Sequence, residues 1–217
     1  ATTADGMRSA ILSRADRQFD WGTKKGADVT PWRLDNPCQA VIYEMHLRDL
    51  TKSPTSGVDE SLRGTYLGAC QEGTVNSHGD ATAFDYIRQL GVNVVQLQPI
   101  SDRYKQYDEE GRVTYNWGYD VQNHSAPETS FSTDPSNTKQ TMKELKTMIR
   151  AYHEAGISVV IDVVYNHTYS TEHGPFQNTV PDYYYRMDPD GRFQNGTGVG
   201  NETASEHEMY RKYMIDS

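Results

Sequence analysis

The chain has 217 residues, of which 35% are hydrophobic and 24% are charged, so it carries enough apolar side chains for a globular core. Its 21 Lys and Arg against 30 Asp and Glu give a formal net charge of -9, which argues against nucleic acid and anionic lipid as partners. The longest apolar stretch, Val159–Val164, is interrupted by Asp162 and is far shorter than the roughly 20 residues of a membrane-spanning helix. The two cysteines, Cys38 and Cys70, allow at most one disulfide.

Residues 1–36 are polar and irregular, because Gly22, Gly26 and Pro31 interrupt any helical or strand period. We interpret them as an N-terminal arm or the end of a preceding domain. The aromatic side chains of this segment, Phe19, Trp21 and Trp32, are expected to pack against the rest of the protein. No targeting peptide is visible at the N-terminus, so localisation stays open.

A repeated pattern follows a first short apolar run at residues 40–45, in which an amphipathic stretch ends at a glycine and leads into a β-branched run. The first copy predicts a helix whose shared face carries Phe84, Ile87 and Leu90, a left-handed cap at Gly91 and a strand at 92–97. The second copy predicts a helix with Met142, Leu145, Ile149 and Tyr152 on one face, a cap at Gly156 and a strand at 157–164. A last helix is expected from Glu206 onward.

Strands that alternate with helices indicate parallel pairing and right-handed crossovers, so the predicted fold class is α/β. Long polar segments at 101–137 and 168–202 follow the carboxyl ends of the second and third strands, where such folds place their ligand sites. Three parallel strands alone would leave two open edges, from which we expect an incomplete sheet. The alternative is a small sheet whose edges are covered by the arm and the long loops.

Three strings carry candidate site residues. Asp162-Val163-Val164-Tyr165-Asn166-His167 ends the third strand, where Asp162 needs a buried partner, His167 would donate to a hydroxyl-rich ligand, and Asn166 would ligate calcium or brace a neighbouring loop. The alternative for His167 is a structural imidazole. Tyr115-Asn116-Trp117-Gly118-Tyr119-Asp120 joins aromatic rings to an amide and a carboxylate, as a saccharide cleft requires, although such rings also anchor long loops.

The third string, Tyr43 to Asp49, ends the first strand, and we interpret its His46, Arg48 and Asp49 as a structural polar network. Motifs of other reaction classes are missing from the sequence: a phosphate-binding glycine loop, a dinucleotide fingerprint, a Gly-x-Ser-x-Gly elbow and a His-Glu-x-x-His helix.

Together these strings resemble type I pullulanases of the α-amylase superfamily. The resemblance begins near Pro37 and adds Gly64-Thr65-Tyr66-Leu67-Gly68, Gln96-Leu97-Gln98-Pro99 and Phe131-Ser132-Thr133-Asp134-Pro135 to the strings above, in the family's order and spacing. It implies that residues 37–217 are the first part, strands one to three, of a (β/α)8-barrel catalytic domain. Such enzymes hydrolyse α-1,6 links in pullulan, amylopectin and branched maltodextrins with retention of configuration.

Retaining hydrolysis needs a nucleophilic carboxylate and an acid/base carboxyl. The resemblance places both, and a third Asp, beyond Ser217, so no catalytic residue is expected in this chain, which would be inactive alone and would need the remainder of the same domain as its partner. It assigns His167 and Tyr119 to sugar binding, and Trp117 and Asp120 to the branch-recognising side. Asp162 and Asn166 are expected to support the site. The family needs no cofactor, and a structural calcium at Asn166 is an open possibility.

Two departures from the family concern the loop around the second string. Val121 stands where the family usually has proline after Tyr-Asp, and Thr129 and Phe131 replace the glycine and tyrosine of Pro-Glu-Gly-Ser-Tyr. These departures leave the fine substrate specificity open. Two alternative functions also stay open: an α-1,4-acting or transferring relative, and a non-catalytic glucan-binding module. The family fits a secreted or cell-surface location and is compatible with a cytoplasmic one.

Overall fold

A computed structural model describes residues 9–22, 34, 36–172 and 174–217, and Trp32 lies outside them. The chain forms two compact units. The first contains residues 1–100 and 127–162, and the second contains residues 101–126 and 163–217.

The first unit contains a parallel three-stranded sheet in the order β1-β2-β5. The strands are β1 (Ile42–Met45), β2 (Val94–Leu97) and β5 (Ser158–Ile161), and Ile42, Val94 and Ser158 are in register. Helix α2 (Ala83–Leu90) precedes β2 and helix α3 (Thr138–Glu154) precedes β5. The predicted alternation of strands and helices is therefore confirmed.

The third strand is shorter than the predicted 157–164. The backbone N–H of Asp162 donates to the carbonyl oxygen of Leu97 at 3.0 Å, and Leu97 is the last residue of β2. Since the neighbouring strand ends there, residues beyond Asp162 have no partner in this ladder. The prediction that Asp162 lies inside a buried strand was wrong: it follows the strand and is half-buried.

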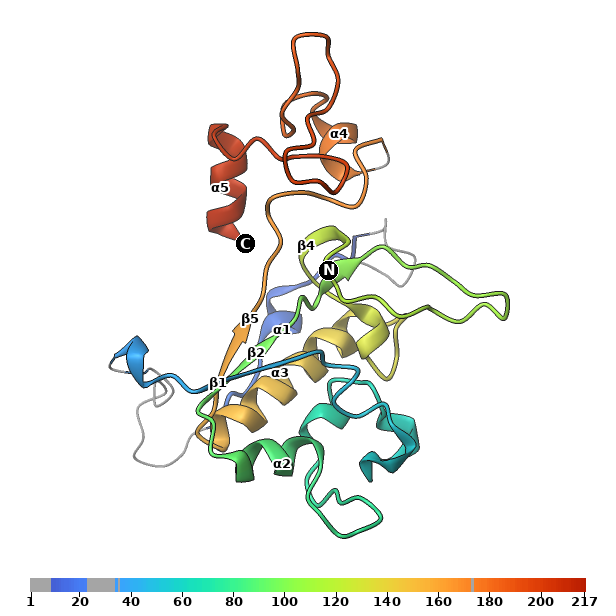
Figure 1. The fold of residues 1–217 in the computed structure, drawn as a ribbon, viewed down its shortest axis with the longest axis vertical. Helices are drawn as coiled ribbons and strands as arrows, with labels where there is room; N and C mark the ends of the chain where they lie inside the picture. The colour runs from blue at the N-terminus through green and yellow to red at the C-terminus, as the bar shows by residue number, and fades with distance from the viewer. Residues whose placement is uncertain (1–8, 23–33, 35, 173) are drawn as a thin grey trace. The chain divides into compact units, whose positions relative to one another are not determined.

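Helices α2 and α3 pack on one face of the sheet and share its core (Figure 1). In α2, Phe84 and Ile87 are buried as predicted, whereas Leu90 in the last turn is exposed. Gly91 caps α2 with φ 76°, a left-handed conformation that glycine adopts at little cost. The buried members of this core are Met45, Leu47, Tyr66, Ala69, Phe84, Ile87, Val95, Leu97, Ile100, Phe131, Met148, Tyr152 and Ile157.

The buried face of α3 differs from the predicted stripe. Met148 and Tyr152 are fully buried, together with the polar side chains of Thr141 and Glu144, while Leu145 and Ile149 pack only partly against the core. The Glu144 carboxylate accepts hydrogen bonds from the Thr133 backbone N–H, the Thr133 hydroxyl and the Gln140 amide. These hydrogen-bond donors compensate the Glu144 carboxylate for its loss of water. A glutamate can therefore occupy a buried helix position that normally carries an apolar residue.

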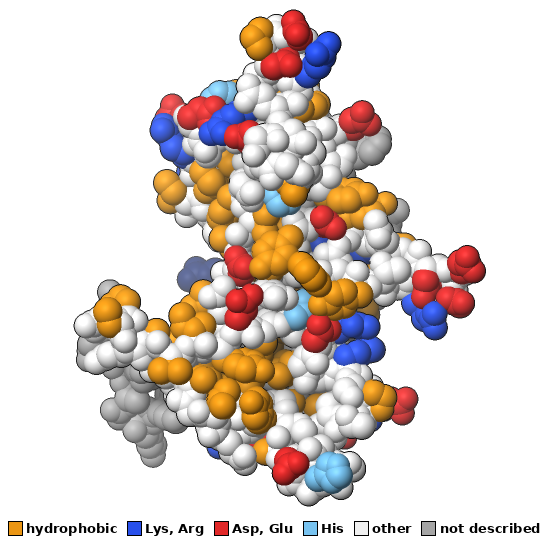
Figure 2. All heavy atoms as spheres, viewed as in Figure 1, with side chains coloured by type: hydrophobic (Ala, Val, Ile, Leu, Met, Phe, Trp, Pro, Cys, Tyr) orange, Lys and Arg blue, Asp and Glu red, His pale blue; other side chains and the backbone are white. Residues whose placement is uncertain are grey.

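The outer strands of the sheet are exposed. Ile42 in β1 is 54% exposed, and Val160 and Ile161 in β5 are 45% and 40% exposed. In the same view as Figure 1, Figure 2 shows apolar side chains reaching the surface in the region of the strands. The alternative of a small sheet with covered edges is therefore wrong for the described residues.

The described part of the arm contacts helix α3. It contains helix α1 (Arg14–Arg17), and the Phe19 ring lies beneath the cations of Lys146 and Arg150, at 6.0 and 5.4 Å from the ring centroid. Phe19 also meets Trp21 edge to face at 4.9 Å. The expected packing against the rest of the protein is confirmed for Phe19, whereas Trp21 packs on Phe19 and is 44% exposed.

The second unit contains structure that the sequence analysis treated as loops. Strands β3 (Ser101–Arg103) and β4 (Val121–Pro127) pair within the expected 101–137 loop, and helix α4 (Pro175–Thr179) lies within the expected 168–202 loop. Helix α5 (Glu208–Asp216) confirms the helix expected from Glu206 onward. Phe176, Tyr185 and Tyr210 form its buried aromatic core. The described residues of the first unit also form the 3-10 helices η1 (Pro37–Gln39), η2 (Pro54–Ser56), η3 (Glu60–Leu62), η4 (Gly68–Cys70) and η5 (Thr129–Phe131).

Cys38 and Cys70 are both free thiols. Among the described residues, no helix combines the length and the apolar character that crossing a bilayer requires.

Candidate functional site

Three successive backbone carbonyls at the start of β4 organise the predicted site in the second unit. The carbonyl of Tyr119 accepts a hydrogen bond from the His167 ring. The carbonyl of Asp120 accepts from the Tyr104 N–H at 2.9 Å, and that of Val121 accepts from the Tyr169 N–H at 3.0 Å. The structure therefore brings together Tyr119, Asp120 and His167, which the sequence placed in two separate strings.

His167 is buried and lies beside the Asn166 side chain. Its Nδ1 lies 3.2 Å from the Asn166 side-chain oxygen. Burial lowers the pKa of His167 below its ordinary value, and the Tyr119 carbonyl and the Asp120 carboxylate oppose that shift. The imidazole is therefore neutral at neutral pH, so it has one N–H to donate and one nitrogen that can accept.

The Asn116 side chain holds the turn at Gly118 within the string Tyr115 to Asp120. Its Nδ2 donates to the Asp120 carboxylate at 2.9 Å, and its Oδ1 accepts from the Gly118 N–H at 2.7 Å. Gly118 has φ 100°, a backbone conformation that would be strained in a residue with a side chain. Tyr119 is half-buried in this turn, while the Trp117 side chain is 65% exposed. Trp117 is thus presented as an open apolar surface, away from the tightly bonded part of the site.

A clamp on the residue after His167 was not predicted from the sequence. The Asn201 side chain accepts from the Thr168 N–H at 3.0 Å and donates to the Thr168 carbonyl at 2.6 Å. The Thr168 hydroxyl lies 2.7 Å from the Tyr185 hydroxyl. All three residues are buried, so this clamp fixes the backbone that carries His167.

His124 is a second buried histidine that the sequence analysis missed. Its Nε2 lies 2.6 Å from the Val164 carbonyl oxygen, and its ring stacks on Tyr165 at 5.3 Å. Burial lowers the pKa of His124, and the hydrogen bond with the Val164 carbonyl opposes that shift. His124 therefore supports the chain between Asp162 and His167 as a neutral hydrogen-bond donor.

Asp162 belongs to the first unit, whereas the other predicted site residues belong to the second. In the first unit, the predicted polar network is confirmed: Asp49 Oδ1 lies 3.4 Å from both His46 Nδ1 and an Arg48 guanidinium nitrogen. His46 also meets the Phe131 ring edge to face. These contacts fit a structural role at the end of β1.

Calcium ligation by Asn166 stays a prediction. The Asn166 side-chain oxygen faces His167, and its backbone carbonyl accepts from the Thr203 N–H at 3.1 Å. Across the described part of the chain, no group of three or more His, Cys, Asp or Glu side chains is placed to hold a metal ion. The charged ligands that calcium prefers would have to come from elsewhere.

Comparison with known proteins places the chain in a family. Residues 66–212 match the family model described as alpha amylase, catalytic domain. The chain is 39% identical over 216 residues to a pullulanase of Bacillus subtilis, with all of the chain and 29% of that protein covered. It is 32% identical to the chloroplastic isoamylase 3 of Oryza sativa, with 92% of the chain and 25% of that protein covered.

Among solved structures, a pullulanase from Paenibacillus barengoltzii in complex with maltohexaose and α-cyclodextrin superposes with a TM-score of 0.89 at 42% identity. The match covers 99% of this chain and 33% of that one. The chain thus spans about a third or less of the length of these relatives.

Proposed function

The chain belongs to the α-amylase family, and we propose that it forms one wall of the glucan cleft in a retaining debranching hydrolase. That enzyme would cleave α-1,6-glucosidic bonds in pullulan, amylopectin and branched maltodextrins. The observation that carries the proposal is the hydrogen bond of His167 to the Tyr119 backbone, which joins the two predicted sugar-binding residues. The pullulanases and isoamylases among the relatives support the same bond type.

Each residue of this wall has a proposed task. The neutral His167 would hydrogen-bond a hydroxyl of the sugar next to the cleaved bond, and the Tyr119 ring would lie against that sugar's apolar face. Asp120, held by Asn116, and the exposed Trp117 would shape the side that recognises the branch. These contacts would tighten as the sugar flattens toward an oxocarbenium-like state.

The remaining residues would support the chemistry indirectly. Asp162 would orient an arginine beside the nucleophile, and Asn166 would brace His167 or bind a structural calcium. The nucleophile and the acid/base carboxyl, about 5 Å apart in retaining enzymes, are assigned to no residue of this chain. By itself the chain would therefore be inactive.

The exposed strands β1 and β5 would receive the other strands of the (β/α)8 barrel. Ile42, Val160 and Ile161 are apolar and exposed along these strands, as unpaired barrel strands would be. The partner that fits such edges is the remainder of the same catalytic domain.

Product analysis of the full-length enzyme tests the proposal. Pullulan joins maltotriose units by α-1,6 links, so α-1,6 cleavage yields maltotriose, whereas an α-1,4-acting or transferring relative yields other products. Maltotriose as the main product supports debranching. Any other main product rejects the α-1,6 assignment.

A non-catalytic glucan-binding module is the second candidate. It would bind maltotriose without cleaving pullulan, and calorimetry on the isolated chain measures that binding directly. Clear binding together with no hydrolysis by the full-length protein would favour the module over the enzyme.

A further inference from the structure

A buried network of charged and amide groups joins strands β3 and β4 in the second unit. Asp102 of β3 is fully buried, and its carboxylate accepts hydrogen bonds from the Lys105 ammonium at 3.0 Å and from the Asn123 side-chain amide of β4 at 2.6 Å. The Lys105 side chain is itself only 8% exposed. Removing one member of a buried ion pair leaves a costly unpaired charge, so such a pair keeps its geometry. The network therefore holds the Asn123 side chain, and with it β4, against β3.

The other face of β4 is held by a different part of the chain. Because successive side chains of a strand point to opposite sides of the sheet, Asn123 and His124 face away from each other. His124 Nε2 lies 2.6 Å from the carbonyl oxygen of Val164, which stands three residues before His167. Strand β4 is thus held between the network on one side and the segment that carries His167 on the other.

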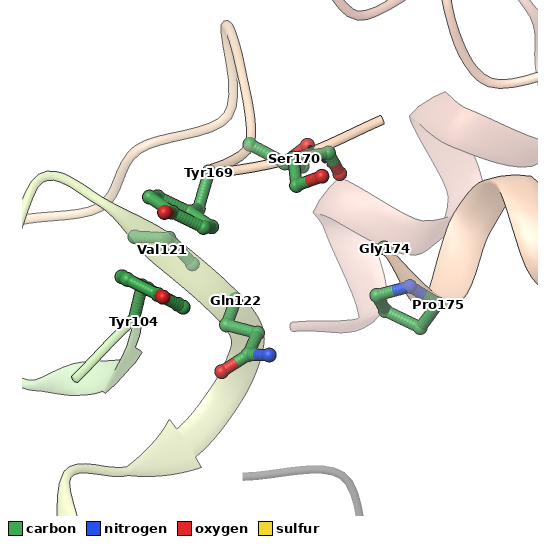
Figure 3. A pocket seen from close by; sticks show the side chains of 8 residues that line it. Tyr104, Val121, Gln122, Tyr169, Ser170, Gly174 and Pro175 are labelled. Atoms are coloured by element: carbon green, nitrogen blue, oxygen red, sulfur yellow. Dashed lines mark hydrogen bonds between the residues drawn. The ribbon is translucent and has the colours of Figure 1, made fainter. Parts of the chain in front are cut away.

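A stacked tyrosine pair makes a second link between β3 and the segment that carries His167. Tyr104 directly follows β3, and its ring stacks on that of Tyr169 with centroids 3.7 Å apart and planes 6° from parallel. Figure 3 shows both rings beside Val121 at the start of β4. The Tyr104 N–H donates to the Asp120 carbonyl at 2.9 Å, and the Tyr169 N–H donates to the Val121 carbonyl at 3.0 Å. A shift of β4 against β3 would therefore disturb both of these hydrogen bonds.

We propose that Asp102 and Asn123 are positioning residues for the reaction, because they place β4 so that the Tyr119 carbonyl can hold the His167 ring. That carbonyl stands directly before the other two acceptors and accepts a hydrogen bond from His167. The direction in which an imidazole presents its second nitrogen to a sugar depends on the bond that the first one makes. The inference rests on the proposed function, because it takes His167 and Tyr119 as the residues that contact the sugar.

Kinetics of the full-length enzyme on pullulan test the inference. Asn123→Ala removes the amide that joins Asp102 to β4 and leaves the ion pair with Lys105 in place. The kcat is expected to fall roughly tenfold, since a small misplacement of a group that contacts the sugar lowers the rate steeply. Asn76→Ala is the matched control: its amide also donates to a carboxylate, that of Asp80 at 3.0 Å, in an exposed hydrogen bond of the first unit, and its kcat should stay at the wild-type value. If the enzyme releases maltotriose and Asn123→Ala keeps the wild-type kcat, the inference fails while the proposed function stands.

A double-mutant cycle separates positioning through His167 from a merely structural role. If Asn123 acts by placing His167, its loss matters little once that ring is gone, so Asn123→Ala should lower the kcat of the His167→Ala enzyme by less than about twofold. A roughly tenfold loss in both backgrounds overturns the inference. Asn123→Gln keeps the amide donor but lengthens the side chain by one methylene, which displaces β4 from β3. The same coupling to His167 is expected of it, and it replaces Asn123→Ala in the cycle if that variant fails to fold.

Hydrogen exchange decides the placement of β4 even if pullulan is not cleaved and the proposed function fails. The Tyr104 and Tyr169 amides donate to carbonyls at the start of β4, so both should exchange about tenfold faster in Asn123→Ala. The Arg186 N–H, which donates to the Glu202 carbonyl at 2.9 Å in the same unit, is the internal reference and should not change. Faster exchange confined to the two tyrosine amides supports the positioning of β4, and equal exchange in variant and wild type overturns it.

Discussion

Replacing Asn201 by alanine is expected to loosen the backbone next to His167. Asn201 satisfies both polar backbone groups of Thr168, at 3.0 and 2.6 Å, and the two residues are only 3% and 2% exposed. Alanine would leave one N–H and one carbonyl buried without this partner. At roughly 1–3 kcal/mol for each unsatisfied group, the local cost is about 2–6 kcal/mol.

Hydrogen exchange of the full-length protein measures this local opening. Even the lower bound of about 2 kcal/mol corresponds to roughly thirtyfold faster exchange of the Thr168 amide. Asn201→Asp keeps an acceptor for the Thr168 N–H but sets a buried carboxylate oxygen against the Thr168 carbonyl oxygen, so it should not restore the clamp. Asn195→Ala is the matched control, because its side chain accepts a single exposed hydrogen bond, from the Gly200 N–H. If Asn201→Ala exchanges no faster than Asn195→Ala, the clamp does not hold this backbone.

Three further changes test other parts of the structure. His167→Ala and Tyr119→Ala should each lower kcat on pullulan several tenfold, and unchanged kinetics would remove both from the site. Glu144→Gln should lower the free energy of unfolding by about 1–3 kcal/mol, since the Thr133 N–H and hydroxyl lose a charged acceptor, and an unchanged urea midpoint would contradict this. Burial lowers the pKa of His124 below 6.5, so below pH 6.5 the unfolded state takes up the proton first and stability falls. His124→Gln should flatten that loss between pH 7.5 and 5.5 in thermal unfolding, and an equal loss in both proteins would rule His124 out.

The parallel sheet was predictable because its signals are local. A β-branched run after a glycine marks β2 and β5, and Gly91 and Gly156 take the left-handed conformation, with φ 76° and 80°, that ends each preceding helix. The strand ends were less predictable, because a strand stops where its neighbour stops, as β5 does beside Leu97. Sequence periodicity carries no information about that neighbour.

Strand β4 and the clamp on Thr168 could not be predicted in the same way. Gln122, Asn123 and His124 are poor strand formers, so the pairing of β4 with β3 is set by tertiary contacts rather than by propensity. Asn201 lies 33 residues from Thr168, in a segment rich in glycine and threonine that shows no periodic pattern. The candidate residues of the strings Tyr115 to Asp120 and Asp162 to His167 were predictable, because aromatic and polar residues stand next to each other in the sequence. Supporting residues such as Asn201 were not, because they lie far from these strings along the chain.

The departures from the family pattern leave the organising carbonyls in place. At Val121, where the family usually has proline, the group that matters is the carbonyl that accepts from the Tyr169 N–H, and proline has the same carbonyl. Val121 is also the first residue of β4, a position that tolerates proline in other strands. Thr129 is buried in η5, outside the segment that bonds His167, Tyr104 and Tyr169. Because these two substitutions spare all three acceptors, the sugar-binding wall proposed for the family can be retained in this chain while its surrounding loop changes.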